Sequence, residues 1–146
     1  MSFSDTMTQI YNRNKFNKVI EEFEEGTREN IGVAYFDLNG LKETNDRYGH
    51  EAGDKLIRQA AQNINAVFTK HTYRIGGDEF AVIASDITKE EFETGIQNVC
   101  ELMNGNRISI ALGHSWMEES SNLQEQLKDA DQKMYADKER AHMERK

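Results

Sequence analysis

Apolar residues follow two different spacings along this chain, and the two spacings alternate. In 14–26, 51–68 and 88–103 the apolar side chains recur every three or four residues, which predicts three amphipathic helices. A last helix is predicted over 121–146, again from apolar residues one helical turn apart. Its apolar stripe is Leu123, Leu127, Ala130 and Met134.

Short runs rich in β-branched and aromatic residues lie between these helices and predict strands. The run 30–38 is apolar almost throughout, so we expect a strand that is covered on both faces. The runs 72–75 and 79–84 flank a glycine pair and predict a hairpin, and a fourth strand is predicted over 107–116. This order of elements indicates an α/β or α+β sandwich in which helices cover a mixed sheet.

Composition narrows the class of protein. The 146 residues show no repeat and no linker, so we expect one compact domain over 1–146. A net charge of -8 argues against binding a nucleic-acid backbone, which needs a basic face. Cys100 is the only cysteine, so a reducing, cytoplasmic setting fits. No apolar run is long enough to cross a bilayer, and we expect no direct membrane contact by this domain.

The predicted hairpin, TYRIGGDEFAVI, carries two adjacent carboxylates. Asp78 and Glu79 follow the pair Gly76 and Gly77. Two neighbouring acidic side chains repel each other unless a positive group neutralises them, and Mg²⁺ prefers carboxylate oxygens. A glycine pair also allows positive φ and the close approach of backbone or ligand. The alternative for this motif taken alone is a solvated acidic turn.

A third carboxylate, Asp37, ends the first predicted strand, and ligands of α/β folds gather at strand ends. The next turn contains Gly40 and leads towards a helix, so its backbone N–H groups can hold phosphate oxygens. The alternative for Asp37 taken alone is a strand-end cap. The hairpin and this turn together favour a site for a cation and a phosphate.

Five segments of the chain follow one another in a family pattern. They are DTMTQIYNR (5–13), FDLNGLKETNDRYGHEAGD (36–54), RIGGDEF (74–80), SIALG (109–113) and DADQKMYADK (129–138). In this order and spacing they resemble the GGDEF family, the diguanylate cyclase domain of bacteria. The resemblance implies a mainly antiparallel central sheet flanked by helices, similar to nucleotide cyclase and polymerase palm domains. It also implies that two GTP molecules condense to cyclic di-3′,5′-GMP with release of two pyrophosphates.

The resemblance assigns metal and phosphate ligands. Asp37, Asp78 and Glu79 would hold Mg²⁺, with Mn²⁺ as an alternative, together with the carbonyl of Leu38. Either Asp78 or Glu79 would take the proton of the 3′-hydroxyl group, and the sequence leaves this choice open. The turn, the hairpin and two basic side chains would bind the triphosphate. These residues are Asn39, Gly40, Leu41, Lys42, Arg74, Gly76, Gly77 and Lys138.

Guanine selection falls to Asn45 and Asp54 in this resemblance. Guanine presents two adjacent donors to a carboxylate, whereas adenine would turn a lone pair towards it, and such sites can discriminate by roughly 10⁴. Helix capping is the alternative for both residues taken alone. His50 matches a family histidine that touches the nucleotide, and a purely structural role is its alternative.

The chain also departs from the family pattern. The inhibitory R-x-x-D site for the product reads Val-Phe-Thr-Lys at 67–70, so we expect no product inhibition there. Asn39, Gln9 and His142 replace a family aspartate, glycine and basic residue. A weakly active or inactive domain that binds GTP as a regulatory module is therefore an alternative to a cyclase. An acidic hairpin that binds a basic protein is another.

The expected assembly follows from the product. Cyclic di-GMP is two-fold symmetric, and one domain can position one GTP, so turnover would need a homodimer. No segment shows the sustained heptads of a coiled coil, and we expect the isolated domain to be mostly monomeric. Because the first family segment begins at residue 5, we expect a piece excised from a longer sensory protein, soluble or membrane-bound.

Overall fold

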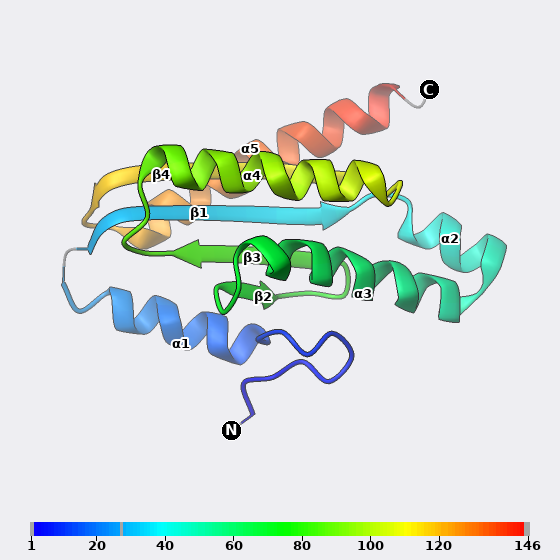
Figure 1. The fold of residues 1–146 in the computed structure, drawn as a ribbon, viewed down its shortest axis with the longest axis horizontal. Coiled ribbons are helices and arrows are strands. Elements are labelled where there is room, and N and C mark those ends of the chain that lie inside the picture. Colours follow the sequence, from blue (N-terminus) through cyan, green and yellow to red (C-terminus); the bar gives the residue numbers. More distant parts are fainter. Residues whose placement is uncertain (1, 27, 145–146) are drawn as a thin grey trace.

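The computed structural model describes residues 2–26 and 28–144, in which five helices and four strands form three layers (Figure 1). The helices are α1 (Arg13–Phe23), α2 (Leu41–Tyr48), α3 (His50–Val67), α4 (Lys89–Gly105) and α5 (Leu123–Glu144), and the strands are β1 (Arg28–Leu38), β2 (Thr72–Arg74), β3 (Glu79–Ala84) and β4 (Ile110–Ser120). Residues 145–146 of the last predicted helix lie outside the described part. No helix of the described ranges is long and apolar enough to cross a membrane.

The sheet has the order β2-β3-β1-β4, and each neighbouring pair is antiparallel. The mainly antiparallel sheet flanked by helices is therefore confirmed, and the mixed sheet expected from the apolar pattern is wrong. The helices α2 and α3 follow β1, and β2 then runs parallel to β1, but β3 lies between these two strands and is antiparallel to both (Figure 1). A single parallel bridge, Tyr11 to Tyr73, attaches the N-terminal segment to the β2 edge.

One helix escaped prediction. The sequence predicted only a short turn around Gly40 that leads towards a helix, and the apolar pattern assigned no element to most of α2, which contains no buried residue. A helix without a buried face has no apolar stripe, which is the signal that periodicity detects. Gly49, with φ 95°, separates α2 from α3, and α3 matches the predicted helix to within a residue at each end.

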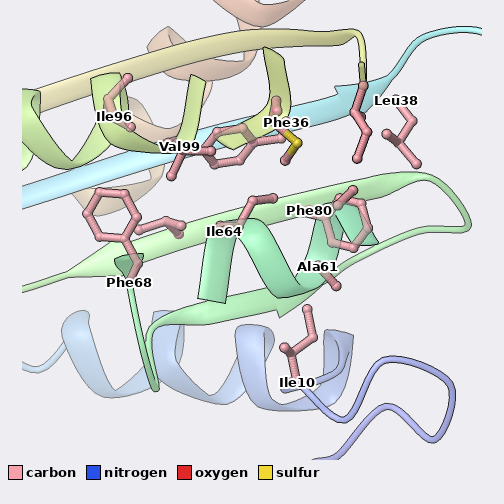
Figure 2. Close-up of a cluster of buried hydrophobic side chains, with 14 of the residues drawn as sticks. Ile10, Phe36, Leu38, Ala61, Ile64, Phe68, Phe80, Ile96 and Val99 are labelled. Carbon is pink, nitrogen blue, oxygen red and sulfur yellow. The ribbon is translucent and has the colours of Figure 1, made fainter. Parts of the chain in front are cut away.

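Two apolar cores cover the two faces of the sheet. Side chains of β1 alternate, so that Phe36 and Leu38 pack under α3 and α4, as Figure 2 shows, while Ile31 and Val33 pack under α1 and α5. Asp37 falls on the α5 side of this alternation. The strand therefore carries a charged residue, 5% exposed as a whole, into a largely buried position.

Strand β4 forms one edge of the sheet, and α5 covers it with polar side chains. The backbone N–H of Leu112 donates to Oδ2 of Asp137 at 2.8 Å, and Lys133 donates to the carbonyl of His114 at 3.3 Å. Both backbone groups lie on the side of β4 that faces away from β1. Side chains of α5 thus supply hydrogen bonds that a further strand would otherwise make.

Replacing Gln9 with glycine should raise the free energy of unfolding by about 0.5–1 kcal/mol. Gln9 has φ 63°, in a tight turn where its N–H donates to the carbonyl of Asp5 at 2.7 Å. This left-handed conformation costs free energy for a residue with a Cβ atom, whereas glycine adopts it without strain. Urea unfolding measures the effect, with Gln9→Ala as the control that keeps the strain. A glycine variant no more stable than the alanine variant would contradict this account.

Candidate functional site

The three predicted carboxylates meet at neighbouring strand ends. Asp37 on β1 faces Glu79 on β3 in the register of the sheet. The N–H of Leu38 donates to the carbonyl of Asp78 at 3.0 Å, so Leu38 and Asp78 are a hydrogen-bonded pair of the two strands. The next pair, Asp37 and Glu79, is therefore a non-hydrogen-bonded pair. In such pairs the facing side chains lie closest. Asp78 precedes Glu79 and completes the cluster.

The cluster is strongly negative. Burial and the charge of Asp37 raise the pKa of Asp78 above its usual range. Burial raises the pKa of Glu79 as well, and the charges of Asp37 and Asp78 add to the effect. A positive group bound between these carboxylates would therefore stabilise their ionised forms.

One positive group already contacts the cluster. Lys138 on α5 donates from Nζ to Oδ2 of Asp37 at 2.6 Å, and this hydrogen bond raises the pKa of Lys138. Oδ1 of Asp37 is buried and has no hydrogen-bond partner among the described residues. Lys138 was predicted at a phosphate, and the structure places it at the carboxylates.

A pocket of about 250 Å³ opens beside the cluster. It brings together the turn after β1, one carboxylate of the hairpin and the end of α5. Its lining residues are Leu38, Asn39, Gly40, Leu41, Lys42, Glu43, Asp78, Lys138, Ala141 and His142. His142 had been noted in the sequence only as a departure from the family, and here it lies with two predicted phosphate lysines. A larger groove of about 470 Å³ between α1 and α5 holds none of the predicted site residues.

The turn after β1 exposes backbone donors. Gly40 has φ 79° and begins α2 without a side-chain capping bond, which leaves the N–H groups of Leu41 and Lys42 open to an anion. Asn39 differs from the prediction, because its N–H donates to the carbonyl of Ser109 at 2.9 Å and is not free for phosphate. Its side chain also donates to Oγ of Ser109 at 3.0 Å. Ser109 lies in the SIALG segment, and this contact was not predicted.

The two glycines of the hairpin do not have the backbone conformation expected of them. Neither Gly76 nor Gly77 has a positive φ, so that part of the expectation is wrong. A Cβ atom on Gly76 would lie 3.2 Å from Oε1 of Glu79, so the atom that approaches this glycine belongs to a side chain, and the close approach of a ligand stays a prediction. Gly77 is exposed, and a Cβ atom on it would meet nothing within 4 Å.

Arg74 holds the hairpin and the N-terminal segment together. Its guanidinium group donates to the carbonyl of Gly77 at 2.8 Å and pairs with Asp5 at 3.2 Å. Asp5 also accepts hydrogen bonds from the backbone and hydroxyl of Thr8, which lower its pKa. The predicted contact of Arg74 with a triphosphate stays a prediction.

Asn45 on α2 packs against Gly53 of α3, the residue that precedes Asp54. A Cβ atom on Gly53 would sit 1.7 Å from Oδ1 of Asn45, so this amide packs against α3 next to Asp54. The capping alternative is wrong for both, because the helices begin at Gly40 and Gly49 without side-chain caps.

The surface beside Asp54 is hollowed. A cavity of about 610 Å³ is lined by Tyr48, Glu51, Ala52, Asp54, Lys55 and Arg58. Tyr48, which was not predicted as a site residue, is 68% exposed and offers an aromatic face there. His50 is exposed at the start of α3, and its nucleotide contact stays a prediction.

The metal ligands likewise stay predictions. Within the described ranges, no group of three or more His, Cys, Asp or Glu side chains is already arranged to hold a metal ion. The unpartnered Oδ1 of Asp37 and the mutual repulsion of the carboxylates nevertheless fit a hard cation.

Comparison with curated proteins finds relatives that are much longer than this chain. The probable diguanylate cyclase DgcJ of Escherichia coli K12 is 30% identical over 94% of this chain, which spans 30% of DgcJ. The cyclic di-GMP phosphodiesterase PdeR of the same organism is 34% identical over 62% of this chain and 14% of PdeR. The chain thus spans less than a third of either relative.

Solved structures and a family model agree on the domain. The GGDEF domain of DgcB from Caulobacter crescentus, solved in complex with c-di-GMP, superposes with a TM-score of 0.79 at 25% identity and covers 95% of this chain and 91% of that one. The family model described as "Diguanylate cyclase, GGDEF domain" matches residues 2–144. The motifs, the sheet and these matches all show that the chain belongs to the GGDEF domain family.

Proposed function

We propose that this domain is a diguanylate cyclase, which condenses two GTP molecules into cyclic di-3′,5′-GMP and two pyrophosphates. The observation that carries the proposal is the meeting of Asp37, Asp78 and Glu79 at neighbouring strand ends, beside a pocket with basic residues. Paired carboxylates next to a pocket lined by two lysines suit metal-assisted phosphoryl transfer. We also propose a cytoplasmic location for the reaction.

The carboxylates and the carbonyl of Leu38 are the proposed metal ligands. Mg²⁺ or Mn²⁺, when bound, would neutralise the charge that develops on the reacting phosphate. Asp37 contributes an oxygen that no other described group engages. Asp78 and Glu79 both have a raised pKa, which moves either one towards the range where a carboxylate accepts a hydroxyl proton efficiently.

The remaining residues bind and orient the nucleotide. The free N–H groups at the start of α2 and the ammonium groups of Lys42 and Lys138 surround one pocket, where they would hold the phosphates. Asn45, which packs against Gly53, and Asp54, which lines the cavity of about 610 Å³, would accept the guanine edge. Arg74 shapes the hairpin that carries Asp78.

A leucine zipper fused ahead of Ser4 should raise the rate per domain at low protein concentration by at least about tenfold. One domain offers one cluster of carboxylates and one guanine pair, so two domains must face each other with their nucleotides antiparallel. The net charge of -8 makes two free copies repel each other. The assay follows cyclic di-GMP formation from GTP and Mg²⁺ across protein concentrations. A rate per domain that depends on neither concentration nor zipper would reject the two-half-site mechanism.

A GTP-binding regulatory module is the second candidate. Two observations favour it: a relative is named as a phosphodiesterase, and His142 stands where the family has another basic residue. The dimerised domain separates the candidates, because a cyclase forms pppGpG and cyclic di-GMP whereas a module only retains GTP. Binding of a basic protein through the hairpin has less support, since Asp78 and Glu79 are only partly exposed.

A further inference from the structure

We propose that Lys138 and a divalent cation are alternative partners of the Asp37 carboxylate. The ammonium group holds Asp37 until a bound phosphate attracts it, and the cation then takes its place. This inference rests on the proposed nucleotide and metal site, and it adds an exchange of counter-ions that couples the two ligands.

The ion pair is short and sheltered at the carboxylate. Nζ of Lys138 lies 2.6 Å from Oδ2 of Asp37, whose side chain is 7% exposed. Little water surrounds Asp37, so a second positive charge on the same carboxylate would be poorly screened from the ammonium group. One buried carboxylate thus accommodates Lys138 or a divalent cation more readily than both.

The ammonium group of Lys138 can also reach a second position, in the neighbouring pocket. The side chain of Lys138 is 46% exposed, unlike that of Asp37. A lysine also carries its charge on a flexible stem, so the ammonium group can move. The same side chain lines the pocket of about 250 Å³ together with Lys42 and His142. A phosphate in that pocket would therefore compete with Asp37 for the ammonium group.

Charge favours the exchange once a phosphate is present. Glu79 faces Asp37 in the register and Asp78 adjoins it, so the cluster can carry three negative charges against the single charge of Lys138. A divalent cation neutralises the cluster further, and the displaced ammonium neutralises the phosphate. Each ligand thereby strengthens the binding of the other, as linkage requires.

The test measures metal and nucleotide binding separately on the intact domain. Mn²⁺ binding without nucleotide is followed by electron paramagnetic resonance, at low salt and in about 1 M KCl, where the screening length is about 3 Å. GTP binding is followed without metal, in excess chelator. Lys138→Met removes the ammonium group and keeps the stem. Lys133→Met is the matched control, because Lys133 lies on the same helix and pairs with Asp129 at 2.8 Å.

Lys138→Met should bind Mn²⁺ about tenfold more tightly than the wild type, at both salt concentrations, and should bind metal-free GTP at least about tenfold more weakly. Lys133→Met should change neither affinity more than about twofold. Opposite shifts from one substitution distinguish an exchange from a folding defect, which would weaken both ligands.

Three outcomes would overturn the exchange. They are a Mn²⁺ affinity that is unchanged or weaker in Lys138→Met, a gain no larger than that of the control, and unchanged GTP affinity. If neither the wild type nor any variant binds Mn²⁺, the result rejects both the exchange and the proposed metal site. If the shifts occur and the zipper-fused dimer forms no product from GTP, the cyclase proposal fails and the exchange stands.

Discussion

Asp78→Asn is expected to lower the rate of cyclic di-GMP formation by at least about 10³-fold, because a metal-assisted step loses several kcal/mol of charge stabilisation with its ligand. The substitution preserves shape and removes the charge next to Asp37 and Glu79. Product formation by the zipper-fused dimer at saturating GTP and Mg²⁺ measures the effect. Turnover within about tenfold of wild type would remove Asp78 from the site.

The fold should survive this change. Since burial and Asp37 raise the pKa of Asp78 in the folded state, its ionised form is disfavoured there at neutral pH. The variant should therefore be as stable as the wild type or more stable at pH 7. This advantage should disappear as the pH falls below the usual carboxyl value of 3.8, where both states are protonated. Asp86→Asn, beyond the other end of β3, is the matched control and should keep full activity.

Asp54→Ser is expected to reduce the preference for GTP over ATP by at least about 100-fold, because a carboxylate that accepts two donors contributes most of such discrimination. Asp54 lines the cavity of about 610 Å³ and follows Gly53, against which the amide of Asn45 packs. Competition between the two nucleotides for the domain measures the preference.

Glu51→Ser is the control for this second prediction. Glu51 lines the same cavity of about 610 Å³ and is exposed, so its removal tests the local charge without the proposed base contact. The control should keep the preference within about threefold. An Asp54→Ser domain that still discriminates like the wild type would show that Asp54 does not contact the base.

Much of the fold was predictable because its signals are local. The amphipathic faces of α3 and α5 and the buried run of β1 appear as spacing in the chain, and the structure contains each of them. Helix α2 was not predictable in this way, because none of its residues is buried. The order of the strands was also hidden, since it depends on β3 folding back between β1 and β2.

The sequence predicted which residues belong to the candidate site, but it did not predict all the contacts that these residues make. The meeting of Asp37 with Glu79 follows from two strand ends that the sequence marks. The partners of Lys138 and Asn39 could not be read in advance, because each contact spans roughly 70 to 100 residues and depends on side-chain reach. Family motifs name which residues gather, whereas the hydrogen bonds depend on tertiary packing.

The hydrogen bonds between α5 side chains and the edge strand β4 bear on how the domain would aggregate. Lys133 lies at the middle of α5 and Asp137 lies in its second half, so a domain that lost the helix from residue 133 onward would expose the backbone of an edge strand 11 residues long. Such an edge can pair with an exposed strand edge of another copy. Truncation within α5 should therefore lead to intermolecular β-sheet aggregates, so that α5 protects solubility as well as carrying Lys138.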